Sequence, residues 1–274
     1  MPELPEVETI KRTLKPLLIG KKFAKPRLLR EDIIKHPLPR EFESILEGRE
    51  IIEVDRRGKY LLIYLTDNYI LAVHLRMTGR LVYCMANEEQ EKHTHVIFPL
   101  NNGDQLRFAD IRRFGCLWLI APDEIDDFTG MSRLGLEPLS ADFSAQYLKE
   151  VLAKRKINIK QALLDQTVIA GLGNIYVDEA LFAAGIAPWR KVMELWDSDW
   201  DRLAEVIPQV LENAIQNRGT TFSDYVDGEG KKGGNMAYLL AYGREGKPCF
   251  RCGSTLIKQR IAGRGSVFCP NCQK

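Results

Sequence analysis

Four cysteines near the end of the chain constrain its fold most strongly. They form two CxxC pairs, CFRC and CPNC, separated by sixteen residues: Cys249, Cys252, Cys269 and Cys272. Each pair can offer two thiolates to one tetrahedral ion, and this spacing is typical of a structural zinc site. Two disulfides are disfavoured because we expect no secretion signal, and CxxC redox chemistry would not need the second pair. We therefore predict one structural Zn2+ with no open coordination position.

The loop between the two cysteine pairs, STLIKQRIAGRGSVF, predicts a β-hairpin. Gly263, Arg264 and Gly265 form its tip, a shape suited to presenting one arginine to a phosphate. Residues 244–274 hold seven Lys or Arg against one Glu, a net charge of +6, so the rest of the chain sums to −4. A basic tail on a near-neutral body favours a polyanionic partner, and a merely solvated tail is the alternative.

The sequence before this tail begins with a helical pattern and continues with strands. Residues 3–18 place apolar side chains at helical spacing and predict an amphipathic first helix. Residues 51–120 hold short β-rich runs separated by turn signals: YLLIYL, YILAVHL, RLVYC, HVIFPL, QLRF and CLWLI. Strands at such close spacing predict a sandwich or barrel. Cys84 and Cys116 lie in strand-like apolar runs, where we expect buried packing residues.

Helical patterns replace the strands after an acidic, turn-rich stretch at about residues 121–142, which we interpret as a linker. The predicted helices are FSAQYLKEVLAK, NIKQALLDQ, IYVDEALFAAG and a longer one over about residues 199–216. A length of 274 residues suffices for about two domains and a small third unit. We predict an α+β multidomain protein, with an N-terminal domain at 1–130, a helical domain at 131–243 and a zinc-finger hairpin at 244–274.

A glycine-bearing turn, GLGN, connects two of these helices, and the second helix begins near Asn174. The N–H groups of a helix start can bind an anion together with the Asn174 side chain, although such a connection is by itself usually just a turn. The upstream stretch KEVLAKRKINIK carries five basic residues against one acid: Lys149, Lys154, Arg155, Lys156 and Lys160. Together these features favour a track for a phosphate backbone.

The chain begins MPELPEVET, with three glutamates and two prolines. A signal peptide needs a basic start and an apolar run, so we expect this stretch to stay in the mature protein. A small second residue normally permits removal of Met1, which would leave Pro2 with a free secondary amine. An α-amino group has a pKa of ~7.7–8.0 against ~10.4 for lysine, so it is a ready nucleophile at neutral pH. No apolar run approaches the ~18 residues of a membrane span, and we expect an intracellular protein.

Eight motifs occur from one end of the chain to the other: MPELPEVET, RRGKYLL, HLRMTG, KHTHV, IRRFG, GLGNIYVDEALF, YGREGKPC and the terminal CxxC pairs. Together they resemble the bacterial formamidopyrimidine-DNA glycosylase family. The resemblance implies an N-terminal β-sandwich with flanking helices, a helical domain with a helix-two-turns-helix, and a zinc finger. It also implies a monomeric enzyme of base excision repair in the bacterial cytoplasm, associated with the nucleoid. Such an enzyme would bind double-stranded DNA, remove 8-oxoguanine opposite cytosine or formamidopyrimidines, and nick the abasic site by β,δ-elimination.

The resemblance assigns four catalytic residues. Pro2 would attack C1′ of the damaged nucleotide and form an iminium ion, with Glu3 as the acid–base residue. Lys59 would donate protons in β-elimination, and Arg264 would take part in δ-elimination and phosphate binding. Without the resemblance, we would interpret Glu3 as a carboxylate in the first turn of a helix and Lys59 as a solvated surface lysine. Glu6 has the same helix reading, with a supporting role as the alternative.

Further residues match positions at which the family contacts DNA: His93, Arg112, Arg155, Lys160, Asn174 and His74. Met77, Arg112 and Phe114 match residues that fill the space left by an extruded nucleotide, which recovers part of the stacking energy. The alternative for Met77 and Phe114 is a place in the core of the strands. His95 has no assigned role.

The chain departs from the family pattern at two points. Residues 233–236 read Gly-Gly-Asn-Met in the loop that covers the extruded base, where the family commonly has a Gly-x-Phe-Gln-like segment. We expect this loop to be more mobile, because it has more glycine and no aromatic residue. The second departure is Arg218, which precedes Gly219 where the family often has another glycine.

Three other functions have different chemistry. An endonuclease VIII-like enzyme for oxidised pyrimidines shares the terminal Pro-Glu and the zinc finger, but typically has glycine where this chain has Leu4. A relative that binds damaged DNA without cutting it would not need the terminal amine of Pro2. A zinc-dependent nuclease is disfavoured, because four cysteine ligands leave no position for an activated water.

Overall fold

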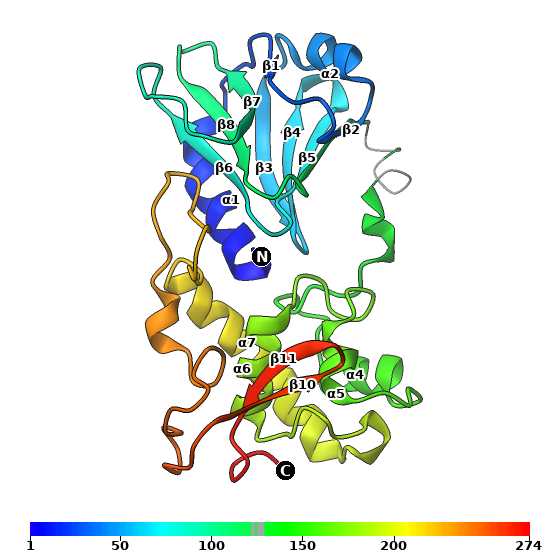
Figure 1. Cartoon of the computed structure of the whole chain (residues 1–274). Coiled ribbons are helices and arrows are strands. Elements are labelled where there is room, and N and C mark those ends of the chain that lie inside the picture. Colours follow the sequence, from blue (N-terminus) through cyan, green and yellow to red (C-terminus); the bar gives the residue numbers. More distant parts are fainter. Residues whose placement is uncertain (122–123, 125–128) are drawn as a thin grey trace. The chain divides into compact units, whose positions relative to one another are not determined.

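The computed structural model describes residues 1–121, 124 and 129–274 (Figure 1). Part of the predicted linker, residues 122–123 and 125–128, lies outside the described residues. Among the residues that are described, no helix is long and apolar enough to cross a membrane.

The chain divides into two compact units. The first consists of Met1–Ser132 and Asn217–Gly234, and the second of Arg133–Gln216 and Asn235–Lys274. Contacts therefore group residues 217–234 with the N-terminal unit, although the sequence pattern places them next to the helical residues. The three domain ranges derived from the sequence stay predictions.

Two β-sheets build the N-terminal unit. The strands are β1 (Arg27–Leu28), β2 (Ile34–His36), β3 (Ile51–Arg57), β4 (Tyr60–Leu65), β5 (Ile70–His74), β6 (Gly79–Cys84), β7 (Thr94–Pro99), β8 (Gln105–Asp110) and β9 (Cys116–Ile120). One sheet has the order β1-β7-β8-β6 and the other β2-β9-β5-β4-β3. Side chains from both sheets, including Ile63 and Phe98, share one core. Cys84 and Cys116 are buried, as predicted. The predicted sandwich of short strands is confirmed.

Helix α1 (Leu4–Leu18) packs against β3 and contributes to this core. Val7, Ile10 and Leu14 recur at helical spacing and are almost completely buried, as the amphipathic pattern predicts. Pro5 lies in the first turn, where its missing N–H group would have no intrahelical partner. A second α-helix of this unit is α2 (Pro39–Leu46).

A buried ion pair fastens α1 to β3. Glu8 Oε2 lies 3.1 Å from Arg56 Nε, and both side chains are almost completely buried. Burial acts to raise the pKa of Glu8, but hydrogen bonding to Arg12 and the charge of Arg56 outweigh it and lower the pKa below its usual value. Glu8 therefore stays ionised and holds the helix in place.

The second unit consists of helices followed by a hairpin. Its elements are α4 (Ala145–Leu152), α5 (Ile159–Leu164), α6 (Asn174–Ala184), α7 (Asp197–Gln216), β10 (Ile257–Ile261) and β11 (Arg264–Phe268). Ser144 and Asn158 cap α4 and α5 by accepting backbone N–H groups at 3.2 and 2.8 Å. Residues Ala262 and Gly263 both have positive φ, as a two-residue hairpin turn requires. The four predicted helices and the predicted hairpin are confirmed. The tip differs from the prediction, because Ala262 and Gly263 form the turn and Arg264 pairs with Ile261 as the first residue of β11.

Candidate active site and zinc site

The start of α1 carries the first two predicted catalytic residues. Pro2 is buried, and Glu3 is only 3% exposed. Glu6, one turn further along the helix, accepts the Glu3 backbone N–H at 2.8 Å through Oε2. Its other oxygen, Oε1, accepts the Thr220 N–H at 2.8 Å. The buried Glu6 carboxylate thus fixes the peptide group between Pro2 and Glu3. This position fits a supporting role for Glu6 next to the terminus.

Lys59 lies in the tight turn between β3 and β4 and is only 7% exposed. The next residue, Tyr60, pairs across the sheet with His74, and their rings meet edge to face with centroids 4.7 Å apart. His74 Nδ1 accepts the Arg76 N–H at 3.0 Å. Burial, followed by the charges of Arg76 and Lys59, lowers the pKa of His74 to about 3. His74 is therefore neutral at physiological pH and stays neutral in mild acid, where a solvated histidine would take up a proton.

The three predicted void-filling residues lie on two exposed turns. Met77 is 41% exposed and Phe114 51% exposed, so neither is a core residue of the strands. The Arg112 guanidinium lies over the Phe114 ring, 4.8 Å from its centroid. The core alternative for Met77 and Phe114 is therefore wrong, while their role on DNA stays a prediction.

Asp110, which the sequence did not single out, organises both turns. Its buried carboxylate accepts the Arg112 N–H at 3.1 Å and the Gly115 N–H at 2.7 Å, and it also accepts the Thr78 hydroxyl. Thr78 follows Met77 directly. One acid thus positions the residues around Met77, Arg112 and Phe114.

The two histidines of KHTHV, His93 and His95, both form hydrogen bonds with the backbone of Asp110. His93 is half-buried with a φ of 69°, and its carbonyl accepts the Asp110 N–H at 3.1 Å. His95 is buried, and its Nε2 donates to the Asp110 carbonyl at 2.7 Å. His95 therefore supports the Asp110 turn, which assigns a structural place to the histidine left without a role.

The four terminal cysteines converge as predicted. Their sulfur atoms all lie within 4.8 Å of one another, with Cys249 and Cys272 at 3.9 Å and Cys252 and Cys269 at 3.4 Å. A tetrahedron of thiolates around zinc, with Zn–S of ~2.3 Å, has edges of about 3.8 Å. The sulfur positions fit that geometry, and a thiolate-only donor set suits zinc. The site is a structural zinc centre.

The hairpin held by this centre is tied to α5 and α6 through the Gly265 carbonyl. Asn174 Nδ2 donates to that oxygen at 3.1 Å and Lys160 Nζ donates to it at 3.2 Å. Asp178 accepts the Val267 N–H at 3.0 Å. These bonds fix strand β11. Its first residue, Arg264, is exposed.

Lys160 differs from the prediction of a phosphate ligand. It is wholly buried, and its ammonium lies 2.6 Å from Asp178 Oδ1. The nearby Arg155 is less deeply buried than Lys160. It is half-buried and pairs with Asp165 at 2.6 Å. In this structure Lys160 therefore serves the hairpin from inside the unit, because packing of α5 against α6 covers it.

Glu179, also missed in the sequence, holds the segment that leads to the zinc finger. Its carboxylate accepts the N–H groups of Leu240, Ala241 and Tyr242, each at 2.8 Å. Burial raises its pKa, and these three bonds oppose that shift. The motifs VDEALF and YGREGKPC are thereby joined, a link that no spacing in the sequence indicates.

Three family models match the chain along most of its length. They describe a formamidopyrimidine-DNA glycosylase N-terminal domain at residues 1–117, a formamidopyrimidine-DNA glycosylase H2TH domain at 134–226, and a zinc finger found in FPG and IleRS at 246–274. The last match agrees with the cysteine geometry and confirms the predicted zinc finger.

Similar proteins cover the whole chain. The formamidopyrimidine-DNA glycosylase of Pelotomaculum thermopropionicum is 50% identical over 100% of this chain and 99% of its own length. A mutant of Lactococcus lactis FPG, solved with Fapy-dG containing DNA, is 36% identical with a TM-score of 0.93 and coverage of 100% of both chains. Wild-type Lactococcus lactis FPG, solved with oxidised pyrimidine containing DNA, is 36% identical with a TM-score of 0.92 and the same coverage. The chain belongs to the formamidopyrimidine-DNA glycosylase family.

Proposed function

We propose that this protein is a bifunctional DNA glycosylase and abasic-site lyase of base excision repair that removes oxidised purines. Its substrates would be 8-oxoguanine opposite cytosine and formamidopyrimidines in double-stranded DNA. The full-length similarity to enzymes named formamidopyrimidine-DNA glycosylase supports the glycosylase part. The work would take place in the bacterial cytoplasm on nucleoid DNA, with the protein acting as a monomer.

The observation that carries the proposal is the buried start of α1. After Met1 is removed, the Pro2 nitrogen attacks C1′ of the lesion nucleotide and the base departs. The sugar ring then opens by cleavage of the C1′–O4′ bond, which leaves an iminium ion at C1′. This ion carries a positive charge without needing a proton, and it draws electrons from the sugar for the eliminations that break the strand. Support comes from the Glu6 carboxylate, whose 2.8 Å bond to the Glu3 N–H holds the adjacent peptide in one position.

Proton transfers and phosphate binding fall to three further residues. Glu3, only 3% exposed, assists opening of the sugar and moves protons during the Schiff-base steps. Lys59 donates protons during β-elimination, and its low exposure of 7% distinguishes it from a solvated surface lysine. Arg264 at the start of β11 binds a phosphate and promotes δ-elimination.

DNA binding divides between phosphate contacts and void filling. His74, His93, Arg155 and Asn174 contact the DNA backbone, with Lys160 acting through the hairpin. Arg112, Phe114 and Met77 enter the duplex where the nucleotide has left. The exposure of Met77 and Phe114 supports this role, because a side chain that enters the duplex must be accessible in the free protein.

Oxidised pyrimidines form a second candidate substrate class. The observation that favours them is the solved complex of wild-type Lactococcus lactis FPG with oxidised pyrimidine containing DNA. Leu4 argues for the purine class, because endonuclease VIII-like enzymes typically have glycine there. We propose purines as the main class.

A product analysis tests the proposal. Protein without Met1 is incubated with duplexes that contain 8-oxoguanine opposite cytosine, an oxidised pyrimidine or an abasic site, and free base and cut strand are quantified. We expect release of 8-oxoguanine and strand cleavage, and neither from protein that retains Met1, since its Pro2 nitrogen is an amide. Base release without cleavage would refute the lyase part. Preferred release of the pyrimidine would favour the second class, and binding without either product would overturn the enzyme reading.

A further inference from the structure

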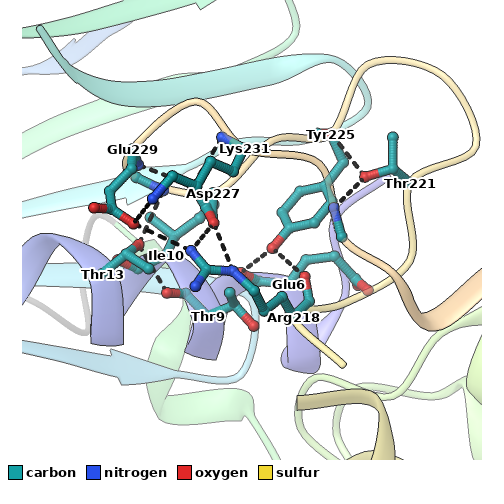
Figure 2. A network of polar contacts seen from close by, with 12 residues as sticks. Glu6, Thr9, Ile10, Thr13, Arg218, Thr221, Tyr225, Asp227, Glu229 and Lys231 are labelled. Carbon is teal, nitrogen blue, oxygen red and sulfur yellow. Dashed lines mark hydrogen bonds and ion pairs between the residues drawn. The ribbon is translucent and has the colours of Figure 1, made fainter. Parts of the chain in front are cut away.

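An ion-pair cluster closes the segment of residues 217–234 in the N-terminal unit (Figure 2). Its centre is Arg218, whose guanidinium contacts two carboxylates. Nε lies 3.1 Å from Asp227 Oδ2, Nη2 contacts the same oxygen, and Nη2 lies 3.2 Å from Glu229 Oε2. The Asp227 side chain is wholly buried, whereas Arg218 is 44% exposed. Arg218 thus joins the beginning of the segment to a turn nine residues further on.

Asp227 also builds the turn that Arg218 reaches. Its Oδ1 accepts the Glu229 N–H at 2.9 Å and the Lys231 N–H at 3.0 Å. The Asp227 N–H in turn donates to the Lys231 carbonyl at 2.9 Å. A wholly buried carboxylate needs a compensating cation, because an unpaired charge in the interior is strongly unfavourable. The turn therefore depends on the guanidinium.

The same turn rests on α1 and β6. The Gly228 N–H donates to Thr13 Oγ1 of α1 at 3.0 Å, and the Gly228 carbonyl accepts the Tyr83 N–H of β6 at 2.8 Å. A side chain at Gly228 would meet Leu14 at 2.4 Å, so the turn lies directly on the helix. The turn at residues 227–231 is thereby fixed to the helix that begins at the catalytic terminus.

The beginning of the segment, at residues 218–220, contacts the start of α1. Arg218 has a φ of 61°, in the left-handed region that favours glycine, and Gly219 follows with 76°. This backbone brings the Thr220 N–H to Glu6 Oε1 at 2.8 Å, and Glu6 Oε2 holds the Glu3 N–H at 2.8 Å. The Arg218 carbonyl accepts the Tyr225 hydroxyl at 3.1 Å. A short chain of hydrogen bonds connects the Arg218 backbone with the Pro2–Glu3 peptide.

We propose that Arg218 is a positioning residue for the catalytic terminus. Its guanidinium fastens the beginning of segment 217–234 to the turn at residues 227–231. The fastened segment holds Glu6, which fixes the Pro2–Glu3 peptide group. Glycine would adopt the same backbone without strain, but it would leave Asp227 without its cation. The effect on catalysis rests on the proposed role of Pro2, whereas the effect on the segment does not.

The test compares Arg218→Gln and Arg218→Lys with Lys232→Gln. The control removes one positive charge from the same segment, at a lysine for which the described residues hold no ion pair. Hydrogen exchange of the Thr220 and Lys231 amides measures the segment. We expect Arg218→Gln to accelerate both by about tenfold or more, Arg218→Lys by less, and Lys232→Gln by less than about twofold.

Single-turnover borohydride trapping on abasic DNA measures the terminus. Abasic DNA lacks a base for the segment to touch, so the trapping rate reports the Pro2 site. We expect Arg218→Gln to slow trapping by about tenfold with DNA affinity changed by less than about threefold, and Arg218→Lys to restore part of the rate.

Three results would overturn the inference in different ways. Unchanged amide exchange in Arg218→Gln would show that the ion pair does not hold the segment. Faster exchange with unchanged trapping would separate the segment from the terminus. An equal loss in Lys232→Gln would reduce the effect to net charge. If the wild type itself forms no adduct, the proposed function fails, and the exchange result still decides whether Arg218 holds the segment.

Discussion

Removal of the Asp178 carboxylate should destabilise the second unit strongly. Asp178 lies 2.6 Å from the Lys160 ammonium, and both side chains are buried, with exposures of 1% and 0%. Asp178→Asn keeps the size of the side chain but leaves a buried cation without its counter-charge. It also weakens the acceptor of the Val267 N–H in the zinc hairpin.

The chain contains a matched ion pair that isolates burial as the cause. Lys149 and Asp197 are also 2.6 Å apart, but their side chains are 48% and 81% exposed. Breaking a buried pair from one side costs about 3–5 kcal/mol. An exposed pair contributes about 0–1 kcal/mol, because water solvates both partners. At equal distance, we therefore expect Asp178→Asn to cost several times more than Asp197→Asn.

Denaturant titration gives both values from tryptophan fluorescence, in which Trp189 reports on the hairpin through its contact with Phe268 at 4.7 Å between ring centroids. A double variant, Lys160→Met with Asp178→Leu, removes both charges and should recover most of the loss. A loss below about 1 kcal/mol in Asp178→Asn, equal to that in Asp197→Asn, would refute the reasoning.

Three further perturbations test other parts of the account. Because burial holds the pKa of His74 at about 3 while the unfolded chain takes up a proton below about 6.5, the free energy of unfolding should fall by up to ~1.4 kcal/mol per pH unit between these values. His74→Gln should flatten this acid limb in denaturant titrations, and an unchanged slope would contradict the assignment. Asp110→Ala removes the acceptor of three donors and should cost roughly 3 kcal/mol and weaken binding to lesion duplex; a loss below about 1 kcal/mol would speak against its organising role. Chelation of zinc should abolish binding to abasic DNA together with loss of about one metal ion per chain, and full affinity of the metal-free protein would refute a structural zinc.

Local patterns predicted the longer elements well. The β-rich runs correspond to β4–β9, because each carries apolar residues and is bounded by turns. Helix α2 (Pro39–Leu46) escaped prediction, since only Phe42 and Leu46 are buried and two apolar positions define no period. Strands β1 and β2 have two and three residues, too short for any alternation.

The site could be predicted where chemistry is local and not where packing decides it. CxxC pairs bind metal through adjacent residues, so the zinc ligands were evident. Lys160 lies in a basic run that predicted a phosphate ligand, but the fold buries it against Asp178, eighteen residues away. Asp110 and Glu179 act on backbone groups of other segments, and no spacing identifies an acid with that task. Arg218 stood out only as a departure from the family, and its partners became visible in the fold.

We expect the free Pro2 nitrogen to form the covalent intermediate. Protein without Met1 is incubated with duplex containing 8-oxoguanine opposite cytosine, the Schiff base is reduced with borohydride, and the adduct is digested with trypsin and analysed by mass spectrometry. We expect one modified peptide, residues 2–11, with the sugar remnant on the nitrogen of Pro2. A remnant on Lys59, or no adduct from protein shown to lack Met1, would contradict it.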